Sequence, residues 1–166
     1  MAPGQGKGNL LPDKVNTSTR QDWRRLYGWM PRLTSAAFLA GWMSFIFRLS
    51  STPPSDLPSQ LEAFAWLGKL RDVAGHLVLF GVLGIVSMIV TWLWIAESNR
   101  QARWAFIAAG LGVLYGGLDE YHQSFVPGRQ ASAFDVLVDS VGVALGVMGV
   151  RCLVAAAVRW RERRSR

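Results

Sequence analysis

Blocks of apolar residues, separated by short polar segments, constrain this chain of 166 residues more than any other feature. They cover residues 33–49, 73–96, 102–121 and 134–158. A helix needs about 20 apolar residues to cross the roughly 30 Å hydrocarbon core of a bilayer. The second block has almost no polar face beyond Ser87 and Thr91, whereas a soluble bundle would repeat polar stripes at the helical period. The sequence therefore predicts an all-α membrane protein, a compact bundle of four transmembrane helices.

The segments on either side of this region are polar and basic. Residues 1–32 predict a cytoplasmic basic arm that is partly disordered, with an interfacial segment where Trp23, Tyr27 and Trp29 alternate with arginines. Residues 33–158 form the expected transmembrane domain, and residues 159–166 form a basic cytoplasmic tail. The first block lacks the cleavage site of a signal peptide, so we expect it to be retained as a helix.

The distribution of charge predicts the orientation of the chain. The net charge is +7, but the basic residues lie at the chain ends and between apolar blocks, which excludes a nucleic-acid groove. By the positive-inside rule, both termini are expected on the cytoplasmic side of the cytoplasmic (inner) membrane. The opposite, extracytoplasmic side is expected to carry most of the acids: Asp56, Glu62, Asp72, Asp119, Glu120, Asp135 and Asp139.

Polar residues recur at helical spacing at the extracytoplasmic ends of three expected helices. Residues three or four apart share a helix face, so each of these ends presents a polar stripe. Ionisable groups at membrane depth are costly unless they are paired or hydrated, so their concentration indicates a functional site. The candidate binding residues are Asp72, His76, Asp119, Glu120, Gln123, Arg129, Asp135 and Asp139.

Structural roles could account for some of these residues. Ser132 and Asp135 match a capping box that opens the last helix, and Asp72 suits a helix N-terminus. Asp119 and Glu120 approach a helix C-terminus, where the macrodipole disfavours acids, so a cation is expected beside them. Arg129, after a Pro-Gly turn, is the nearest candidate for an ion pair with them.

Two kinds of chemistry remain open for the cluster. An ion-paired network is favoured over a metal site and no cofactor is expected, although six residues could ligate a divalent ion: His76, Asp119, Glu120, His122, Asp135 and Asp139. Acid-base catalysis is the other alternative, with four candidate catalytic residues: Asp119, Glu120, His122 and Asp135. No nucleophile paired with a base stands out in the sequence.

Small residues in the apolar blocks suggest close helix packing. Gly142 and Gly146 form a Gly-x-x-x-Gly motif, which serves either contact within one monomer or dimerisation, so the oligomeric state stays open. The single cysteine, Cys152, provides neither a disulfide nor a cysteine zinc site, and we interpret it as a small hydrophobe of the core.

The segment from Leu114 to Arg129, LYGGLDEYHQSFVPGR, followed by Asp135, Asp139 and Gly142, resembles the VanZ-like family. The segment RDVAGH at residues 71–76 is similar to a second motif of that family. Two positions differ from many members, because Val73 stands where they have lysine and Asp139 where they have asparagine. The family is named for a member associated with resistance to the glycopeptide antibiotic teicoplanin. The resemblance therefore implies a role at the extracytoplasmic face of the cell envelope, where glycopeptides act on lipid-linked precursors.

Three functions are compatible with these observations. The first is a non-enzymatic membrane protein whose cluster binds a lipid headgroup or a lipid-linked cell-wall precursor, with an effect on antibiotic susceptibility. Arg129, with Arg71 or Lys69, would then contact phosphate. The alternative is a membrane enzyme that modifies or hydrolyses a lipid-linked substrate. A small transporter is disfavoured, because few polar residues continue through the cytoplasmic halves of the helices.

Overall fold

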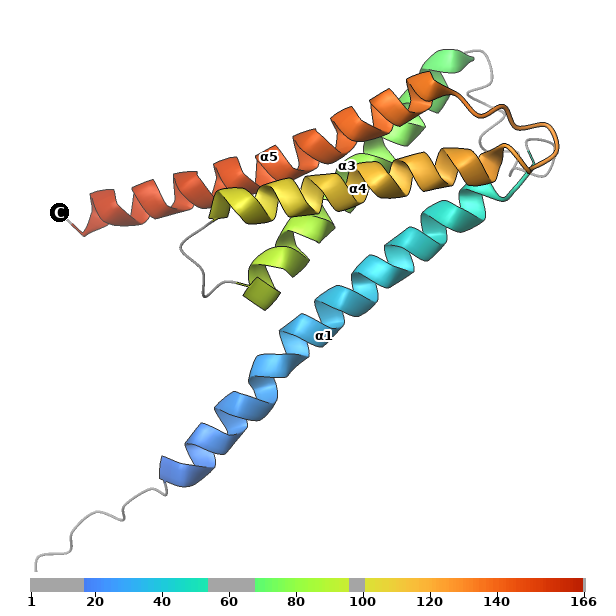
Figure 1. The fold of residues 1–166 in the computed structure, drawn as a ribbon. Helices are drawn as coiled ribbons and strands as arrows, with labels where there is room; N and C mark the ends of the chain where they lie inside the picture. Colours follow the sequence, from blue (N-terminus) through green and yellow to red (C-terminus); the bar gives the residue numbers. More distant parts are fainter. Residues whose placement is uncertain (1–16, 54–67, 96–100, 166) are drawn as a thin grey trace, which may run out of the picture.

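The computed structural model describes the backbone of residues 17–53, 68–95 and 101–165, and the side chains of 28–53, 68–94 and 103–165. Within these ranges the chain is helical and has no strand, which confirms the predicted all-α class. The helices are α1 (Thr17–Ser50), α3 (Lys69–Ile95), α4 (Gln101–Gln123) and α5 (Ala133–Arg164) (Figure 1). Of the N-terminal arm predicted to be partly disordered, residues 1–16 lie outside the described residues and residues 17–32 are helical.

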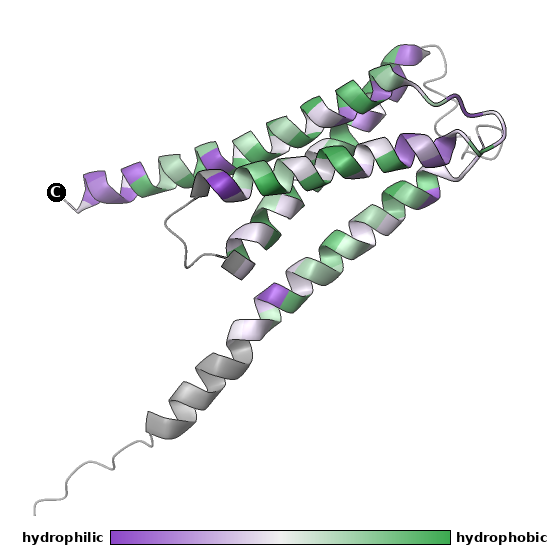
Figure 2. Ribbon diagram, viewed as in Figure 1, coloured by the Kyte–Doolittle hydropathy of each residue, from purple (hydrophilic) through white to green (hydrophobic). Residues whose placement is uncertain are grey.

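Among the described residues, three helices are long and apolar enough to cross a membrane, over Gly28–Ser50, Lys69–Trp94 and Ala133–Arg164. The helix α4 is not among them, and its last two turns carry Asp119, Glu120, His122 and Gln123. Large hydrophobic side chains cover the outside of the helices, and Phe106, for example, is 76% exposed. Figure 2 shows hydrophobic residues along most of the length of the helices, with hydrophilic residues concentrated toward the helix ends. Such a surface is suited to contact with lipid.

Contacts between the helices fix their relative directions. The helices α3 and α5 run parallel, because Leu77 and Gly81 approach Gly142 and Gly146 in the same order. The helix α4 runs antiparallel to α5, since Gly112 faces Val143 and Gly116 faces Asp139. Close packing here depends on the missing side chains, because a Cβ atom on Gly142 would lie 2.8 Å from the Leu77 carbonyl oxygen. The Gly-x-x-x-Gly motif therefore serves contact within the monomer.

The helix α1 packs antiparallel to α3 through its second half. Trp42 Nε1 donates to the Leu79 carbonyl oxygen at 3.0 Å, and Arg32 Nε donates to the Leu93 carbonyl oxygen at 3.0 Å. Ile46 of α1 joins the buried cluster that also contains Phe80 and Val143. In Figure 1 the first turns of α1 diverge from the other three helices.

Cys152 lies on the exposed surface of α5, so its interpretation as a core residue is wrong. The residues from Arg151 to Ser165 are all exposed, because α5 extends beyond α3 and α4 in this direction (Figure 1). An apolar sequence block alone does not distinguish lipid-facing residues from residues that face a neighbouring helix.

Candidate functional site

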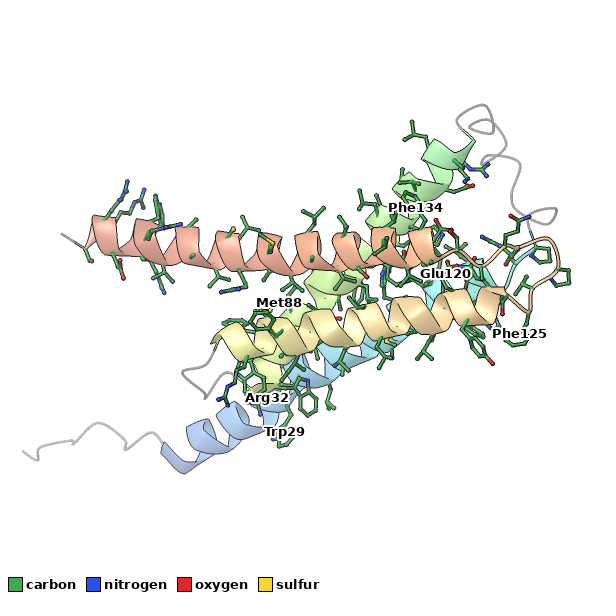
Figure 3. All side chains as sticks on the ribbon, turned by 45° about the horizontal axis from the view of Figure 1, so that its top comes forward. Trp29, Arg32, Met88, Glu120, Phe125 and Phe134 are labelled. Atoms are coloured by element: carbon green, nitrogen blue, oxygen red, sulfur yellow. The ribbon has the colours of Figure 1, made fainter. Side chains whose placement is uncertain are left out.

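The polar residues gather at one end of the bundle, where α1 and α4 end and α3 and α5 begin. Figure 3 shows Glu120 there, close to Phe134 at the start of α5, whereas Trp29 and Arg32 lie toward the opposite end. Hydrogen bonds between residues distant in sequence connect the four helix ends. We use the name loop-end cluster for the residues that make them: Ser50, His76, Asp119, Glu120, Ser132 and Asp139.

Asp119 is buried and satisfied by neutral donors. Its Oδ1 accepts from Ser50 Oγ at 2.6 Å, and its Oδ2 accepts from Gln123 Nε2 at 3.0 Å. The first bond joins α4 to α1, while the second lies within α4. These donors explain how a carboxyl group is accommodated near the negative end of a helix without an ion pair to any described residue.

Glu120 joins α4 to the start of α5. Its Oε2 accepts from the backbone N–H of Ser132 at 2.9 Å, and Ser132 is the N-cap residue of α5. The Ser132 Oγ accepts from the Phe134 N–H at 3.2 Å, so Ser132 caps α5, whereas the predicted capping box would place this bond at the Asp135 N–H. In a complete box Asp135 would accept from Ser132, but the buried Glu120 takes that donor.

His76 and Asp139 form a pair between α3 and α5. The His76 Nδ1 atom lies 2.9 Å from Asp139 Oδ1, and the Asp139 side chain has 0% exposure. The His76 ring stacks parallel to Phe80 at a centroid distance of 6.3 Å, which orients the imidazole. On the other side Asp139 packs against Gly116, where a Cβ atom would lie 3.3 Å from Asp139 Oδ2.

Two carboxylate oxygens of the loop-end cluster accept no hydrogen bond from any described residue. They are Glu120 Oε1 and Asp139 Oδ2, and both are buried. Buried polar atoms in folded proteins are almost always paired, so an unpaired carboxylate oxygen indicates a missing partner. His76, Glu120 and Asp139 each offer one ligand atom, and these atoms all lie within 4.8 Å of one another.

Arg129 does not pair with either predicted acid. Its Nη2 donates to the carbonyl oxygens of Leu49 at 2.8 Å and Thr52 at 3.1 Å, and its Nε donates to Thr52 at 3.2 Å. The ion pairs found among the described side chains do not include Arg129, so the predicted pair with Asp119 or Glu120 is wrong. The Leu49 carbonyl lies in the last turn of α1 and also accepts from the Thr52 N–H at 3.2 Å, and Thr52 follows the helix. The guanidinium therefore binds the carbonyl groups at the end of α1 and directly after it.

The remaining predicted site residues do not take part in the hydrogen bonds that define the loop-end cluster. Asp72 pairs with the adjacent Arg71 at 2.9 Å and is 58% exposed. Asp135 lies in the first turn of α5 and is half-buried. His122 Nε2 lies 2.9 Å from Ser51 Oγ, whose own hydrogen is donated to the Phe47 carbonyl oxygen. Ser51 is therefore not arranged as a nucleophile activated by His122.

The sequence reasoning missed the contribution of α1. Ser50, Ser51 and Thr52 bring a hydroxyl to Asp119, a hydroxyl to His122 and a carbonyl to Arg129. A run of three hydroxyl residues directly after the first apolar block was the available signal, because that block ends on the same side as the polar stripes.

Comparison with known proteins places this geometry in a family. No curated protein and no solved structure matches the chain. The sequence pattern of the VanZ/LLP1 family matches residues 35–154. This range includes the four helix ends whose residues form the loop-end cluster. This match confirms the resemblance drawn from the motifs around Asp119 and His76. Most of the length of the chain lies within this match, and its apolar helices are able to span a bilayer. The chain therefore belongs to the VanZ/LLP1 family of membrane proteins.

Proposed function

We propose that the loop-end cluster lies at the extracytoplasmic face of the cytoplasmic membrane and that α4 crosses the bilayer with the other three helices. Support comes from charge, because the opposite end of the bundle carries Arg32, Arg103 and the exposed arginines of residues 159–164. Basic residues flanking a span favour the cytoplasmic side. The beginning of α1 and the end of α5 lie at this basic end, so both termini are cytoplasmic in the proposed topology (Figure 1).

At that face, the cluster is proposed to bind the phosphate-bearing headgroup of a lipid or a lipid-linked cell-wall precursor. The main support is a pair of buried carboxylate oxygens, Glu120 Oε1 and Asp139 Oδ2, at the polar end of an apolar bundle. Neither accepts a hydrogen bond from the part of the chain that the structure describes. They offer acceptor positions for headgroup hydroxyl or ammonium donors, or for a cation shared with phosphate. Lys69, Arg71 and Arg129 lie on the neighbouring helix start and loop, where a phosphate would meet them.

Binding of this kind would affect the access of glycopeptide antibiotics to their targets at the same face. The resemblance to a teicoplanin-associated member supports this consequence by analogy. Susceptibility should change with expression of the chain only if it binds the precursor.

The test is saturable lipid binding by the purified protein in nanodiscs. Polyprenyl diphosphate-linked disaccharide, polyprenyl phosphate and phosphatidylglycerol are compared with diacylglycerol, which lacks phosphate. We expect saturable binding of phosphate-bearing lipids, weakened at least about tenfold by Lys69→Ala combined with Glu120→Gln. Glu162→Gln on the exposed tail is the matched control. Equal binding of diacylglycerol, or binding unaffected by the cluster variant, would exclude the proposal.

A membrane enzyme acting on a lipid-linked substrate is the second candidate. The observation in its favour is the His76–Asp139 pair beside Glu120, because an imidazole oriented by a carboxylate is a common acid-base arrangement. The same lipid panel distinguishes the two functions, since an enzyme releases phosphate, diphosphate or a shortened product over time. Binding without any product assigns the chain to the first candidate.

A further inference from the structure

We propose that His76, Glu120 and Asp139 hold a divalent transition-metal ion of the Mn²⁺ or Zn²⁺ class. This proposal goes beyond headgroup binding, because it is inferred only from the geometry of the side chains. The ion would bind whether or not a lipid is present.

The distances suit a shared ion. One ligand atom from each residue lies within 4.8 Å of the others. Two donors on opposite sides of an ion bound at about 2.1 Å would be about 4.2 Å apart, and adjacent donors would be about 3 Å apart. His76 Nδ1 and Asp139 Oδ1 already lie 2.9 Å apart. An ion bound to both as adjacent ligands takes the place of the proton that they share. Ligand atoms up to 4.8 Å apart must approach by no more than about 0.6 Å to come within the roughly 4.2 Å that two such bonds span.

The burial of the carboxylates supplies a second, independent observation. Glu120 and Asp139 are 4% and 0% exposed, yet each has one oxygen without a hydrogen bond from the described residues. Leaving a buried acceptor unpaired is unfavourable, and more so for a charged group. A dication would pair both oxygens and balance both negative charges, with the imidazole contributing a neutral nitrogen ligand.

The surrounding structure holds the ligands toward a common point. Glu120 lies one turn after Gly116 on α4, and Gly116 is the residue against which Asp139 packs. Stacking on Phe80 fixes the His76 ring, and the Ser132 N–H fixes Glu120 Oε2. Ordered outer contacts of this kind orient metal ligands in known sites.

The ligand set indicates the class of metal and its role. One imidazole with two carboxylates suits Mn²⁺, Zn²⁺ or Fe²⁺ better than Ca²⁺ or Mg²⁺, which prefer oxygen ligands alone. Three protein ligands leave coordination positions open for water or for an oxygen of a bound molecule. An ion here could therefore contact a phosphate oxygen at the same end of the bundle.

The test uses Mn²⁺ on the full chain, purified in detergent without a histidine tag and without added lipid. We expect one bound ion per chain and an electron spin resonance signal that shows coupling to an imidazole nitrogen. The chain has two histidines, so His76→Gln should abolish the coupling while His122→Gln preserves it. Thermal unfolding should shift upward with Mn²⁺ or Zn²⁺ in the wild type.

Variants of the carboxylates complete the experiment. Glu120→Gln and Asp139→Asn keep the side-chain shape and should weaken Mn²⁺ binding at least about tenfold. Loss of a residue that only supports a metal ligand already weakens metal binding by about that factor. Asp72→Asn, an exposed acid one turn before His76, is the matched control and should bind normally. Circular dichroism of the metal-free proteins verifies that each variant is folded. Absence of stoichiometric binding, or imidazole coupling that depends on His122, would overturn the metal site while leaving headgroup binding to its own lipid test.

Discussion

At the scale of single residues, Arg129 connects the loop between α4 and α5 to the end of α1. Its guanidinium donates to the carbonyl oxygen of Leu49, in the last turn of α1, and to that of Thr52, which follows the helix. The bonds come from a charged donor to carbonyls that are partly buried, so they are stronger than bonds between neutral groups. The residue thus acts as a cap on another helix.

Arg129→Gln should therefore lower the free energy of unfolding by about 1.5–3 kcal/mol, the range for hydrogen bonds to charged groups. Arg159→Gln, on the exposed part of α5, should change it by less than about 0.5 kcal/mol. Reversible unfolding in mixed detergent micelles measures both values. Equal effects of the two substitutions would show that Arg129 does not hold α1.

Ser50 gives a second test of the contact between α1 and α4. Ser50→Ala removes the 2.6 Å donor to the buried Asp119, and leaving that carboxyl oxygen without its partner should cost about 1–3 kcal/mol. Ser44→Ala is the matched control, because Ser44 is exposed and its hydroxyl bonds only to Ala40 of its own helix. The same unfolding assay compares them, and a cost as small as that of Ser44→Ala would contradict the role of the bond.

Sequence reasoning identified which residues meet at the loop end but not all of their partners. Helical spacing and the alternation of spans were enough to place His76, Asp119 and Asp139 at one end of the bundle. Hydrogen-bond partners depend on side-chain positions within a few ångströms, which spacing does not supply. Glu120 therefore takes the Ser132 N–H expected for Asp135, and Arg129 binds carbonyl groups instead of acids.

At the scale of elements, glycines determine how closely α3, α4 and α5 approach. A Cβ atom on Gly146 would lie 2.8 Å from the Ile85 nitrogen, whereas one on Gly149 would meet nothing within 4 Å. The two glycines lie on the same helix and differ in what faces them. Backbone contact of this kind is the packing that small residues allow between helices in membranes.

Gly146→Ala should destabilise the protein by about 1–3 kcal/mol, because the backbones of α3 and α5 must separate to admit the methyl group. Gly149→Ala should stabilise it by up to about 1 kcal/mol through helix propensity. Thermal unfolding of the two variants in one detergent gives the comparison. A stabilising effect of Gly146→Ala would contradict the close approach of the two helices.

The positions of the helices were largely readable from the apolar blocks, but their ends were not. Blocks at 73–96 and 102–121 correspond closely to α3 and α4. The helix α1 begins at Thr17, well before its apolar block, and α5 continues to Arg164 through the basic tail. Hydropathy detects the part of a helix that meets lipid, whereas arginine and tryptophan are compatible with helix beyond it.

At the scale of the whole molecule, charge asymmetry predicts the orientation in the membrane. The end of α5 carries Arg159, Arg161, Arg163 and Arg164, all exposed, and such residues resist transfer across the bilayer. The loop-end cluster lies at the other end, so its loop is expected outside the cell. Single cysteines can test this, in a background where the exposed Cys152 is replaced by alanine.

Cysteine at Gln130, in the exposed loop before α5, should react with an impermeant maleimide on intact cells, whereas cysteine at Ser165 should react only after permeabilisation. The two positions flank α5, so opposite accessibility requires that this helix cross the membrane.

A cysteine at Thr52 tests whether the helices before α5 cross the membrane. It should react like the one at Gln130, because both positions lie at the end of the bundle that carries the loop-end cluster. Labelling at Thr52 and Gln130 but not Ser165 supports an even number of crossings between the two loops, as expected if α3 and α4 both span. Labelling of Ser165 alone on intact cells would reverse the proposed topology. Labelling of Thr52 without Gln130 would show an odd number of crossings between them, so that α3 and α4 do not both span the membrane.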